Sequence, residues 1–417
     1  MLTDASESPP ASALLKQRDY LFFWASRWMG GLGVQIQSVA MGWQVYDLSR
    51  QQHLDINHAS FNVSLIGLVT FTPLLLLALP AGETVDRRDR RLVLSLCYVA
   101  EIAGVGILAV STLSDSASVP LLLGVAVLFG AARSFFSPAM TALGPMLVPR
   151  ELLPRAIAWN SLAWQSASIA GPALAGFLIA ASPGIAYCGT LALYAAAALC
   201  LVFIRRSTRP MTQSGSRLEL VKEGLVYVWS NRVVFGAISL DLAAVILGGA
   251  SALLPAFARD VLHAGPLGFG LLRMGPALGA TVVGLILAVR PIRAKAGLIM
   301  FAGVAVFGAA TVVFGYSRWM WLSVAALAVL GGADALSVFV RQVLVQLVTP
   351  DHMRGRVAAV STLFISASNE LGEFESGVAA RLLGAVGAAV FGGYGALAVT
   401  GLWAWMFPAL RRADRLE

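Results

Sequence analysis

Charge is scarce in this sequence. Only 12% of the 417 residues are Asp, Glu, Lys or Arg, about half the share found in a soluble globular protein. Hydrophobic residues make up 58% of the chain. A soluble protein of this composition would lack the polar groups needed to cover its surface, whereas a helix bundle that faces lipid needs few of them. The composition therefore predicts a protein embedded in a membrane.

Lysine is especially rare, with three residues in the chain. None of Lys16, Lys222 and Lys295 follows a glycine, so there is no Walker-type phosphate loop. The chain is therefore not expected to be an ATP-driven pump by itself. No motif of a catalytic nucleophile is present either, which argues against an enzyme.

Cysteine and histidine are equally few. The three cysteines, Cys97, Cys188 and Cys200, lie in apolar runs, so a disulfide framework or a thiolate metal site is not expected. The four histidines fall in expected loops and lack the neighbours of a metal site. We expect no metal and no cofactor. The first twenty residues are polar and do not resemble a cleavable signal peptide.

Long apolar runs occupy most of the chain. Each is about 20 residues or more, enough to cross a hydrocarbon layer roughly 30 Å thick. The runs cover residues 21–46, 60–83, 92–112, 119–147, 152–181 and 184–204, and then 233–258, 266–290, 295–315, 318–348, 354–385 and 387–410. We therefore expect an all-α membrane protein of twelve transmembrane helices in two six-helix bundles.

The formal charge of +8 comes from short basic clusters between alternate runs. This pattern is the positive-inside rule, and it argues against a nucleic-acid partner. It places both termini in the cytoplasm and leaves only Arg50, Arg259 and Arg318 on the opposite side. The expected division is a tail at 1–20, a first bundle at 21–204, a cytoplasmic linker at 205–232, a second bundle at 233–410 and a tail at 411–417. Residues 218–229 of the linker have the spacing of a short helix on the membrane surface.

The two halves are related by an offset of 201 residues. The offset aligns Gly130-Ala-Ala-Arg133 with Gly331-Gly-Ala-Asp334, and residues 149–155 with 350–356. It also places Gly171 on Gly372 and Gly176 on Gly377. An even number of spans in each unit predicts parallel repeats around an axis normal to the membrane, with a site between them near its middle.

A charged loop between the second and third runs carries the clearest motif. It reads Gly82-Glu-Thr-Val-Asp86-Arg87-Arg88-Asp89-Arg90-Arg91. The order of a glycine, an Asp-Arg pair and a basic pair resembles the loop signature of the major facilitator superfamily. The resemblance implies a cytoplasmic gate in which Asp86 meets a helix N-terminus or an arginine of a neighbouring helix. The alternative is that Arg87, Arg88, Arg90 and Arg91 only anchor the topology.

Further resemblances concern the direction of transport. Gly171-Pro172-Ala-Leu-Ala-Gly176 is similar to the Gly-Pro motif of the antiporter branch, which is associated with export. The sequence VPREL after the fourth run and Leu254-Pro255-Ala256 in the seventh resemble the siderophore and macrolide exporters, the enterobactin exporter among them. The resemblance covers essentially the whole chain in span layout.

Charges within the apolar runs are candidates for function, because one at the bilayer centre costs about 3 kcal/mol. The candidates are Arg27, Glu101, Arg133, Asp241, Arg273, Asp334, Arg341, Glu370, Glu373, Glu375 and Arg381. The family resemblance implies that the first, fourth, seventh and tenth spans line the cavity, and these spans carry Arg27, Arg133, Asp241, Asp334 and Arg341. Arg133 and Asp334 are repeat-related and opposite in sign. We expect them to face each other, as an ion pair with a structural role or as two halves of a binding site.

Glu370 and Glu373 lie three residues apart and therefore share a helix face. In a dry site two neighbouring carboxylates are rarely both ionised, because burial and the neighbouring charge raise the pKa of one of them. A raised pKa is what a proton carrier needs. The alternative is that one of them pairs permanently with Arg341 or Arg381. Among the aromatic residues, Trp28 and Trp164 are set furthest from the span ends and are candidates for substrate contact.

These observations predict a proton-coupled exporter of a drug-like or siderophore-like organic molecule in the cell inner membrane, working by alternating access. The expected partners are a small-molecule substrate, the proton and the lipid bilayer, and a monomer is expected. An importer of an organic anion with Arg27 and Arg133 as its clamp is the first alternative. A non-transporting membrane receptor is the second.

Overall fold

The computed structural model describes residues 12–206, 217–290, 292 and 294–412, and its regular elements are helices. The long helices of the first half are α2 (Arg18–Gln51), α3 (Ile56–Arg87), α4 (Arg90–Leu113), α5 (Val119–Leu143), α6 (Leu153–Ala181) and α7 (Pro183–Val202). Those of the second half are α9 (Arg232–Gly248), α11 (Gly265–Val289), α12 (Ala296–Tyr316), α13 (Met320–Val348) and α14 (Arg354–Met406). The expectation of an all-α membrane protein is confirmed.

Short elements complete the described chain. They are α1 (Ser12–Leu15), η1 (Gly144–Leu147), η2 (Arg150–Leu152), α8 (Arg217–Ser230), η3 (Ser251–Leu253), α10 (Leu254–Ala256), the π-helical η4 (Phe257–Val261) and α15 (Pro408–Arg411).

Ten helices in the described part of the chain are long and apolar enough to cross a membrane. One of them, α14, has 53 residues and is divided by Gly384, whose φ of +77° is not helical. The 34-residue α2 is not among the ten, although its length suffices. The count of twelve therefore stays a prediction.

Polar side chains at the helix starts explain several boundaries. The Asp89 carboxylate accepts a hydrogen bond from the Arg91 N–H at 2.9 Å, and the Asn231 side chain accepts from the N–H groups of Val233 and Val234 at 3.1 Å. Asp55 caps α3 by accepting from the His58 N–H at 2.8 Å, and this bond, together with one to the His58 ring, holds the pKa of Asp55 below its usual value. Such caps satisfy the free N–H groups of the first turn.

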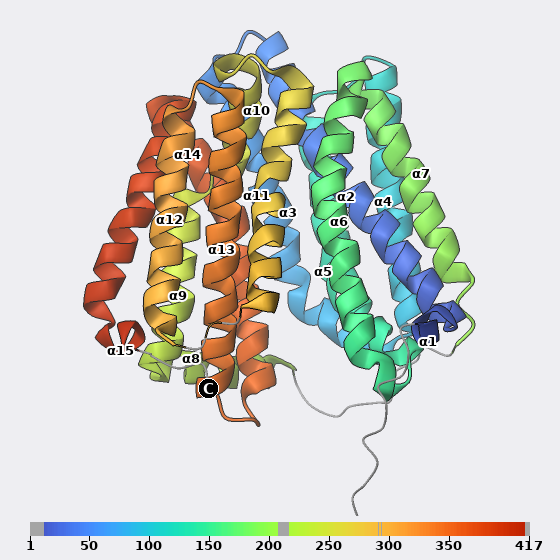
Figure 1. The fold of residues 1–417 in the computed structure, drawn as a ribbon. Helices are drawn as coiled ribbons and strands as arrows, with labels where there is room; N and C mark the ends of the chain where they lie inside the picture. Colours follow the sequence, from blue (N-terminus) through green and yellow to red (C-terminus); the bar gives the residue numbers. More distant parts are fainter. Residues whose placement is uncertain (1–11, 207–216, 291, 293, 413–417) are drawn as a thin grey trace, which may run out of the picture.

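The helices form two bundles, α2–α7 and α9–α14 (Figure 1). We call the end at which α8 lies the linker end, and the opposite end, where residues 52–55 and 262–264 connect helices, the distal end. The ribbons of the two bundles lie close together at the distal end and diverge toward the linker end (Figure 1). The bundles meet mainly where α3 packs on α14 and where α6 packs on α11.

The hydrophobic core follows the same division. One cluster of buried side chains runs through the first bundle and continues into the distal parts of the second, including Leu253, Phe257, Phe269 and Ala380. A separate cluster contains only residues of the second bundle and of α8. Apolar packing therefore joins the bundles at the distal end.

Repeat-related glycines make equivalent contacts inside each bundle. A Cβ at Gly130 of α5 would lie 2.1 Å from the carbonyl oxygen of Thr70 in α3, and one at Gly331 of α13 would lie 2.1 Å from that of Pro276 in α11. Only a glycine allows backbones to approach this closely. The duplicated sequence therefore builds duplicated helix packing.

The second pair of repeat-related glycines joins the bundles. A Cβ at Gly176 of α6 would lie 3.2 Å from the Cα of Gly270 in α11, and one at Gly377 of α14 would lie 1.9 Å from Oγ of Ser64 in α3. Since α3 and α11 occupy equivalent places in the repeat, the two crossings are related by the axis between the bundles. The parallel-repeat arrangement is confirmed.

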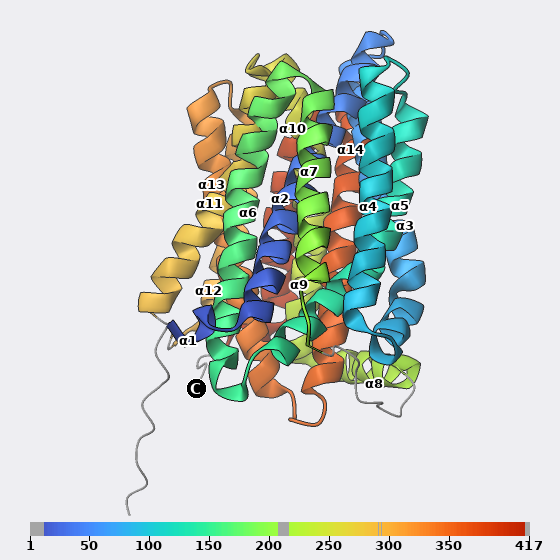
Figure 2. The same ribbon diagram turned by 90° about the vertical axis from the view of Figure 1, so that its right-hand side faces the viewer.

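The linker helix α8 lies across the linker end (Figure 2). Glu223 forms an ion pair with Arg356 at the start of α14, and the Tyr227 hydroxyl donates to the Val348 carbonyl at 3.0 Å. The expected helix is present, and these contacts attach it to the second bundle. Residues 207–216 of the expected linker lie outside the described residues.

Candidate transport site

Four charged side chains meet where the bundles join. Glu373 of α14 forms an ion pair with Arg273 of α11, with 3.7 Å between Oε1 and Nη1, and both side chains are 27% exposed. Glu370 lies one turn along α14 and interacts electrostatically with Glu373, Arg273 and Arg133. The two glutamates therefore share a charged face, as their spacing predicted.

The alternative in which one glutamate pairs with Arg341 or Arg381 is wrong, because both arginines have other contacts. Arg341 pairs with Asp241, and Arg381 lies over the ring of Phe61, 5.2 Å from its centroid. From the sequence, Arg273 is one of the charges within the apolar runs, and nothing there assigns it to a site. Its role depends on which face of α11 turns toward α14, and that face is set by helix packing.

The charged face lies against α3 of the other bundle. A Cβ at Gly67 would lie 3.1 Å from the carbonyl oxygen of Glu370 and 3.3 Å from the Cβ of Glu373. Relative motion of the two bundles must therefore change the surroundings of both glutamates.

Arg133 and Asp334 do not pair in this structure. Arg133 interacts electrostatically with Glu101 of its own bundle and with Glu370 of the other. Asp334 instead lies near Asp241 and Arg341, within the second bundle. The expected facing pair is replaced by two separate clusters, because the side chains on α5 and α13 find partners on other helices.

The cluster inside the second bundle is built on a buried ion pair. The Arg341 side chain is 2% exposed and binds Oδ2 of Asp241, whose side chain is 9% exposed. Nε and Nη2 of Arg341 have no hydrogen-bond partner among the described residues. Asp241 and Asp334 both line a small cavity between α9, α12 and α13, together with Ser337. This cluster joins α9 to α13.

Arg27 lies in α2 beside an aromatic group. Tyr20 and Tyr98 interact with it electrostatically, and its Nε has no hydrogen-bond partner in the described chain. On the same helix Trp28 stacks on Trp24, with ring centroids 6.3 Å apart and planes 5° from parallel. The indole of Trp28 donates to Ser166 of α6 at 3.1 Å.

The other tryptophan of interest is Trp164, whose side chain is 48% exposed on α6. Trp24 also donates to the carbonyl of Trp159 at 2.9 Å. The contacts of Trp24 and Trp28 therefore join α2 to α6. The exposed ring of Trp164 offers flat apolar surface.

The residues of the motif loop lie at the linker end, where α3 ends and α4 begins. Gly82 is buried, Asp86 and Arg87 belong to the last turns of α3, and Arg90 and Arg91 open α4. Arg90 donates to the Ala142 carbonyl at 3.2 Å, and Arg91 binds the Ile204 carbonyl. Both contacts are within the first bundle. The gate role of the motif stays a prediction.

The antiporter-like motif lies at a helix crossing. A Cβ at Gly171 would lie 2.5 Å from the Cβ of Gln35 in α2. On the other side of α6, the carbonyl of Pro172 lies 2.5 Å from a Cβ built on Gly270, and Gly176 packs against the same glycine. The motif thus holds α6 against its own bundle and against the other.

This crossing predicts the effect of a wedge. Gly270→Val should open the distal end, because the added atoms would clash with the backbone of α6. The clash should destabilise the closed arrangement by about 1–3 kcal/mol. Spin labels at Gln52 and His263, which are exposed on opposite bundles, would report a longer distance by double electron–electron resonance. Gly284→Val on the same helix is the control, since no atom lies within 4 Å of its Cβ. Equal distances in the two variants would contradict the prediction.

A set of ion pairs closes the distal end. Asp47 of α2 binds Arg259 of η4, and Arg50 lies 3.4 Å from Asp260. The Tyr46 hydroxyl also donates to Asp260. We call Asp47, Arg50, Arg259 and Asp260 the distal latch. Sequence reasoning assigned the two arginines only to topology and missed the latch, although an aspartate lies close to each of them in sequence.

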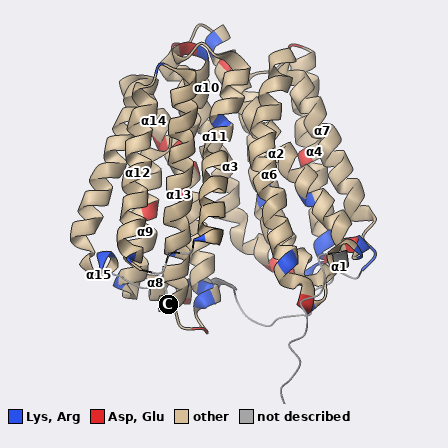
Figure 3. Cartoon of the chain, viewed as in Figure 1, with Lys and Arg blue, Asp and Glu red and all other residues tan. Residues whose placement is uncertain are grey.

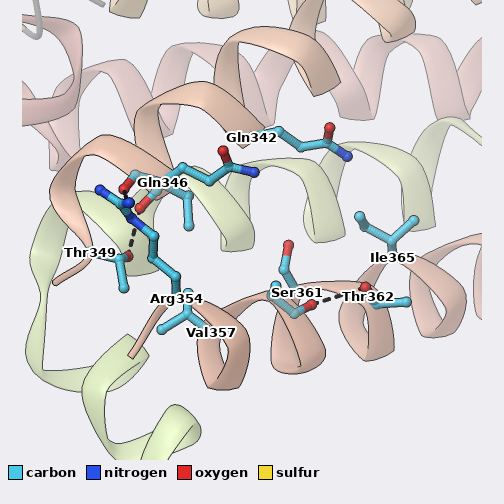
Figure 4. Close-up of a pocket in the computed structure, with 10 residues that line it drawn as sticks. Gln342, Gln346, Thr349, Arg354, Val357, Ser361, Thr362 and Ile365 are labelled. Atoms are coloured by element: carbon cyan, nitrogen blue, oxygen red, sulfur yellow. Dashed lines mark hydrogen bonds between the residues drawn. The ribbon is translucent and has the colours of Figure 1, made fainter. Parts of the chain in front are cut away.

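A cavity near the linker end lies between α13 and the start of α14 (Figure 4). Its volume is about 200 Å³, and its lining includes the polar side chains of Gln342, Gln346 and Ser361. Nε of Arg354 donates to the Gln346 carbonyl at 3.1 Å. Within the described residues, no group of three or more His, Cys, Asp or Glu side chains is placed to hold a metal ion.

Two bundles related by a repeat, joined at one end and carrying charges at their junction, define the architecture. A family model described as transmembrane secretion effector matches residues 10–416. The chain belongs to this family of the major facilitator superfamily. The multidrug efflux pump Tap of Mycobacterium bovis BCG is 30% identical to it over 406 residues, covering 93% of this chain and 92% of that protein. Tap of Mycobacterium tuberculosis matches equally.

Solved structures show the same fold. The POT family transporter PepTSo superposes with a TM-score of 0.75 at 12% identity, over 94% of this chain and 98% of that one. A bacterial homologue of the iron transporter ferroportin in an inward-facing state gives a TM-score of 0.68 at 18% identity, over 95% and 99%. As a member of the transporter family that matches residues 10–416, the protein is a multi-pass membrane transporter and not an enzyme.

Proposed function

We propose that this protein is a proton-coupled exporter of drug-like or siderophore-like organic molecules. The observation that carries the proposal is the Glu373–Arg273 ion pair, with Glu370 beside it, at the junction of the two bundles. Charges are kept inside a membrane protein at a cost, and those at a moving interface can couple ion binding to motion. The relationship to a multidrug efflux pump supports the substrate class.

Alternating access follows from the packing. The distal end is closed by apolar packing and by the distal latch, while the two bundles diverge toward the linker end (Figure 1). A rocking motion would break the latch, bring the linker ends together and turn the site toward the other side. The motif loop from Gly82 to Arg91 lies where such a closure would form its contacts.

Competition explains how a proton drives export. When the glutamates are ionised, Arg273 balances one charge and the site can hold a cationic or polar substrate. A proton that binds Glu370 or Glu373 removes a negative charge, which weakens substrate binding and frees an arginine. Asp241, Asp334 and Arg27 remain candidates for a second proton or substrate contact.

The charge distribution supports the orientation. Lysines and arginines gather at the linker end, and few charged residues lie along the middle of the helices (Figure 3). By the positive-inside rule the linker end is then cytoplasmic, which places both termini inside the cell and the distal latch outside. We propose a location in the cell inner membrane, action as a monomer, and a division into bundles at residues 21–204 and 233–410.

Inside-out membrane vesicles test the direction of transport. A panel of ethidium and erythromycin should accumulate in them, and an acidic interior should increase the accumulation. Vesicles carrying empty vector are the control. Uptake by right-side-out vesicles, with none by inside-out vesicles, would contradict export and favour the importer.

Glu373→Gln tests the coupling. The variant should lose most of the stimulation by an acidic interior, because its amide cannot bind and release a proton while Arg273 stays charged. We expect a roughly tenfold lower accumulation under a pH gradient, equivalent to about 1.4 kcal/mol. Exchange of external for internal substrate without a gradient should persist.

Glu375→Gln is the matched control for this variant. Glu375 lies two residues along α14 from Glu373, so it lies on a different side of the helix. Its variant should keep the pH dependence of the wild type. A wild-type pH profile in Glu373→Gln would count against Glu373 as the coupling residue, and Glu370 would be tested next.

A further inference from the structure

Glu101 is a buried carboxylate with an unfilled hydrogen-bonding position. Glu101 is 4% exposed, and its Oε2 has no hydrogen-bond partner in the described chain. A charged carboxylate in such a place needs a cation close by. Glu101 lies on α4, away from the junction of the bundles, and the transport cycle proposed above does not use it.

The packing of α4 on α5 brings Arg133 to the level of Glu101. One turn toward the distal end, Gly104 packs against Phe129, whose Cε1 would lie 2.5 Å from a Cβ on the glycine. One turn toward the linker end, the rings of Tyr98 and Phe136 meet edge to face, 5.3 Å apart. Glu101 and Arg133 lie between these two contacts, and they interact electrostatically.

The other groups around Glu101 cannot replace the arginine. Tyr194 of α7 is within hydrogen-bond reach, but its hydroxyl donates its hydrogen to Oε1 of Gln37 at 2.6 Å. On α4 itself Tyr98 donates to the Ser26 carbonyl at 3.0 Å. Arg133 is the cation that acts on Glu101 among the described residues.

Arg133 also reaches toward the other bundle. Side chains in a helix lean toward its N-terminus, so Arg133 leans toward the distal end and Glu370 of α14 leans toward the linker end. The arginine lies nearly two turns nearer the linker end, since Gly130 packs on Thr70 of α3 and Arg133 follows Gly130 by almost one turn, whereas Glu370 packs on Gly67. Along the helix axes the two side chains therefore lean toward each other, and they interact electrostatically.

Glu370 is faced by charges from three elements: Glu373 of its own helix, Arg273 of α11 and Arg133 of α5. Arg133 forms no ion pair within 4.0 Å with any residue that the structure describes. It is shared between two carboxylates, one in each bundle.

We propose that Glu101 is a positioning residue for proton coupling, which holds the Arg133 guanidinium whenever Glu370 is neutral. The guanidinium keeps its charge at all accessible pH values, so protonating Glu370 would otherwise leave an unbalanced cation in the membrane. Arg133 thus moves between a carboxylate of the other bundle and one of its own. This inference rests on the proposed proton coupling.

The test measures the pH at which the distal end opens. Spin labels at Gln52 and His263, in a background with the three cysteines replaced by alanine, report the opening in detergent without a substrate. Glu101→Gln should lower the midpoint by about one pH unit, because Arg133 is then left to Glu370 and favours its ionised form. Glu101→Asp should keep the wild-type midpoint, and Glu375→Gln is the control with the same chemical change.

A double-mutant cycle separates this role from a structural one. In an Arg133→Gln background, adding Glu101→Gln should not move the midpoint further, because Glu101 acts through the arginine. The double variant removes both the carboxylate and the guanidinium. Its midpoint, compared with that of Arg133→Gln alone, therefore still tests the role of Glu101 if Glu101→Gln alone does not fold. An unchanged midpoint in Glu101→Gln, or an equal shift with and without Arg133, would overturn the proposal. A wild type without pH dependence would contradict the proposed coupling itself.

Discussion

Replacing Arg341 by methionine is expected to lower the free energy of unfolding by about 3–5 kcal/mol. The side chain is 2% exposed and neutralises Asp241, with Asp334 beside the pair. Methionine fills a similar volume but leaves two carboxylates without a cation in a dry part of the second bundle. The change would appear as a lower midpoint of thermal unfolding in detergent.

Two further variants make this expectation specific. Arg341→Met combined with Asp241→Asn should recover part of the loss, because one of the stranded charges is then removed. Arg381→Met is the matched control, since Arg381 is exposed and its described contact is the ring of Phe61. That contact is worth about 1 kcal/mol. Equal destabilisation by Arg341→Met and Arg381→Met would show that the buried pair has no special weight.

Charge reversal in the distal latch is the second large effect. Asp47→Arg would face Arg259, and Arg259→Asp would face Asp47, so each change turns an attraction into a repulsion. Both side chains are about one third exposed, which reduces the effect to about 1–2 kcal/mol, or roughly tenfold in the closed population. The transport rate should fall, and the distance between labels at Gln52 and His263 should lengthen.

The double variant decides whether the pair itself matters. Asp47→Arg with Arg259→Asp restores opposite charges and should recover most of the closed population and of the transport rate. Arg318→Asp is the control, because Arg318 is an exposed arginine expected on the same side and forms no ion pair within the described chain. A double variant as impaired as the single ones would contradict the latch.

Much of the architecture could be predicted because it depends on local chemistry. Apolar runs of spanning length, basic clusters and the 201-residue repeat predicted a helical membrane protein of two bundles. The break expected at residue 386 lies within two residues of Gly384, where the backbone is left-handed. Spacing along one helix placed Glu370 and Glu373 on one face, and the structure agrees.

Partner choice between helices could not be predicted in the same way. The repeat register suggested that Arg133 faces Asp334, but a register gives the height of a residue and not the rotation of its helix. Rotation turns Asp334 toward Arg341 and Arg133 toward Glu101 and Glu370. Likewise, nothing local distinguishes Arg273 from Arg341 or Arg381 as the partner of Glu373.

The scarcity of charged residues in the sequence was enough to predict a helical protein that is surrounded by lipid. The placement of its few basic clusters was enough to predict the orientation. These follow from the composition and order of the residues, because transfer of a side chain into lipid depends mainly on that side chain. Only the tertiary structure decided which of the few charges meet. Ion pairs such as Asp47 with Arg259 and Arg273 with Glu373 join distant segments, and their geometry is set by how whole helices pack.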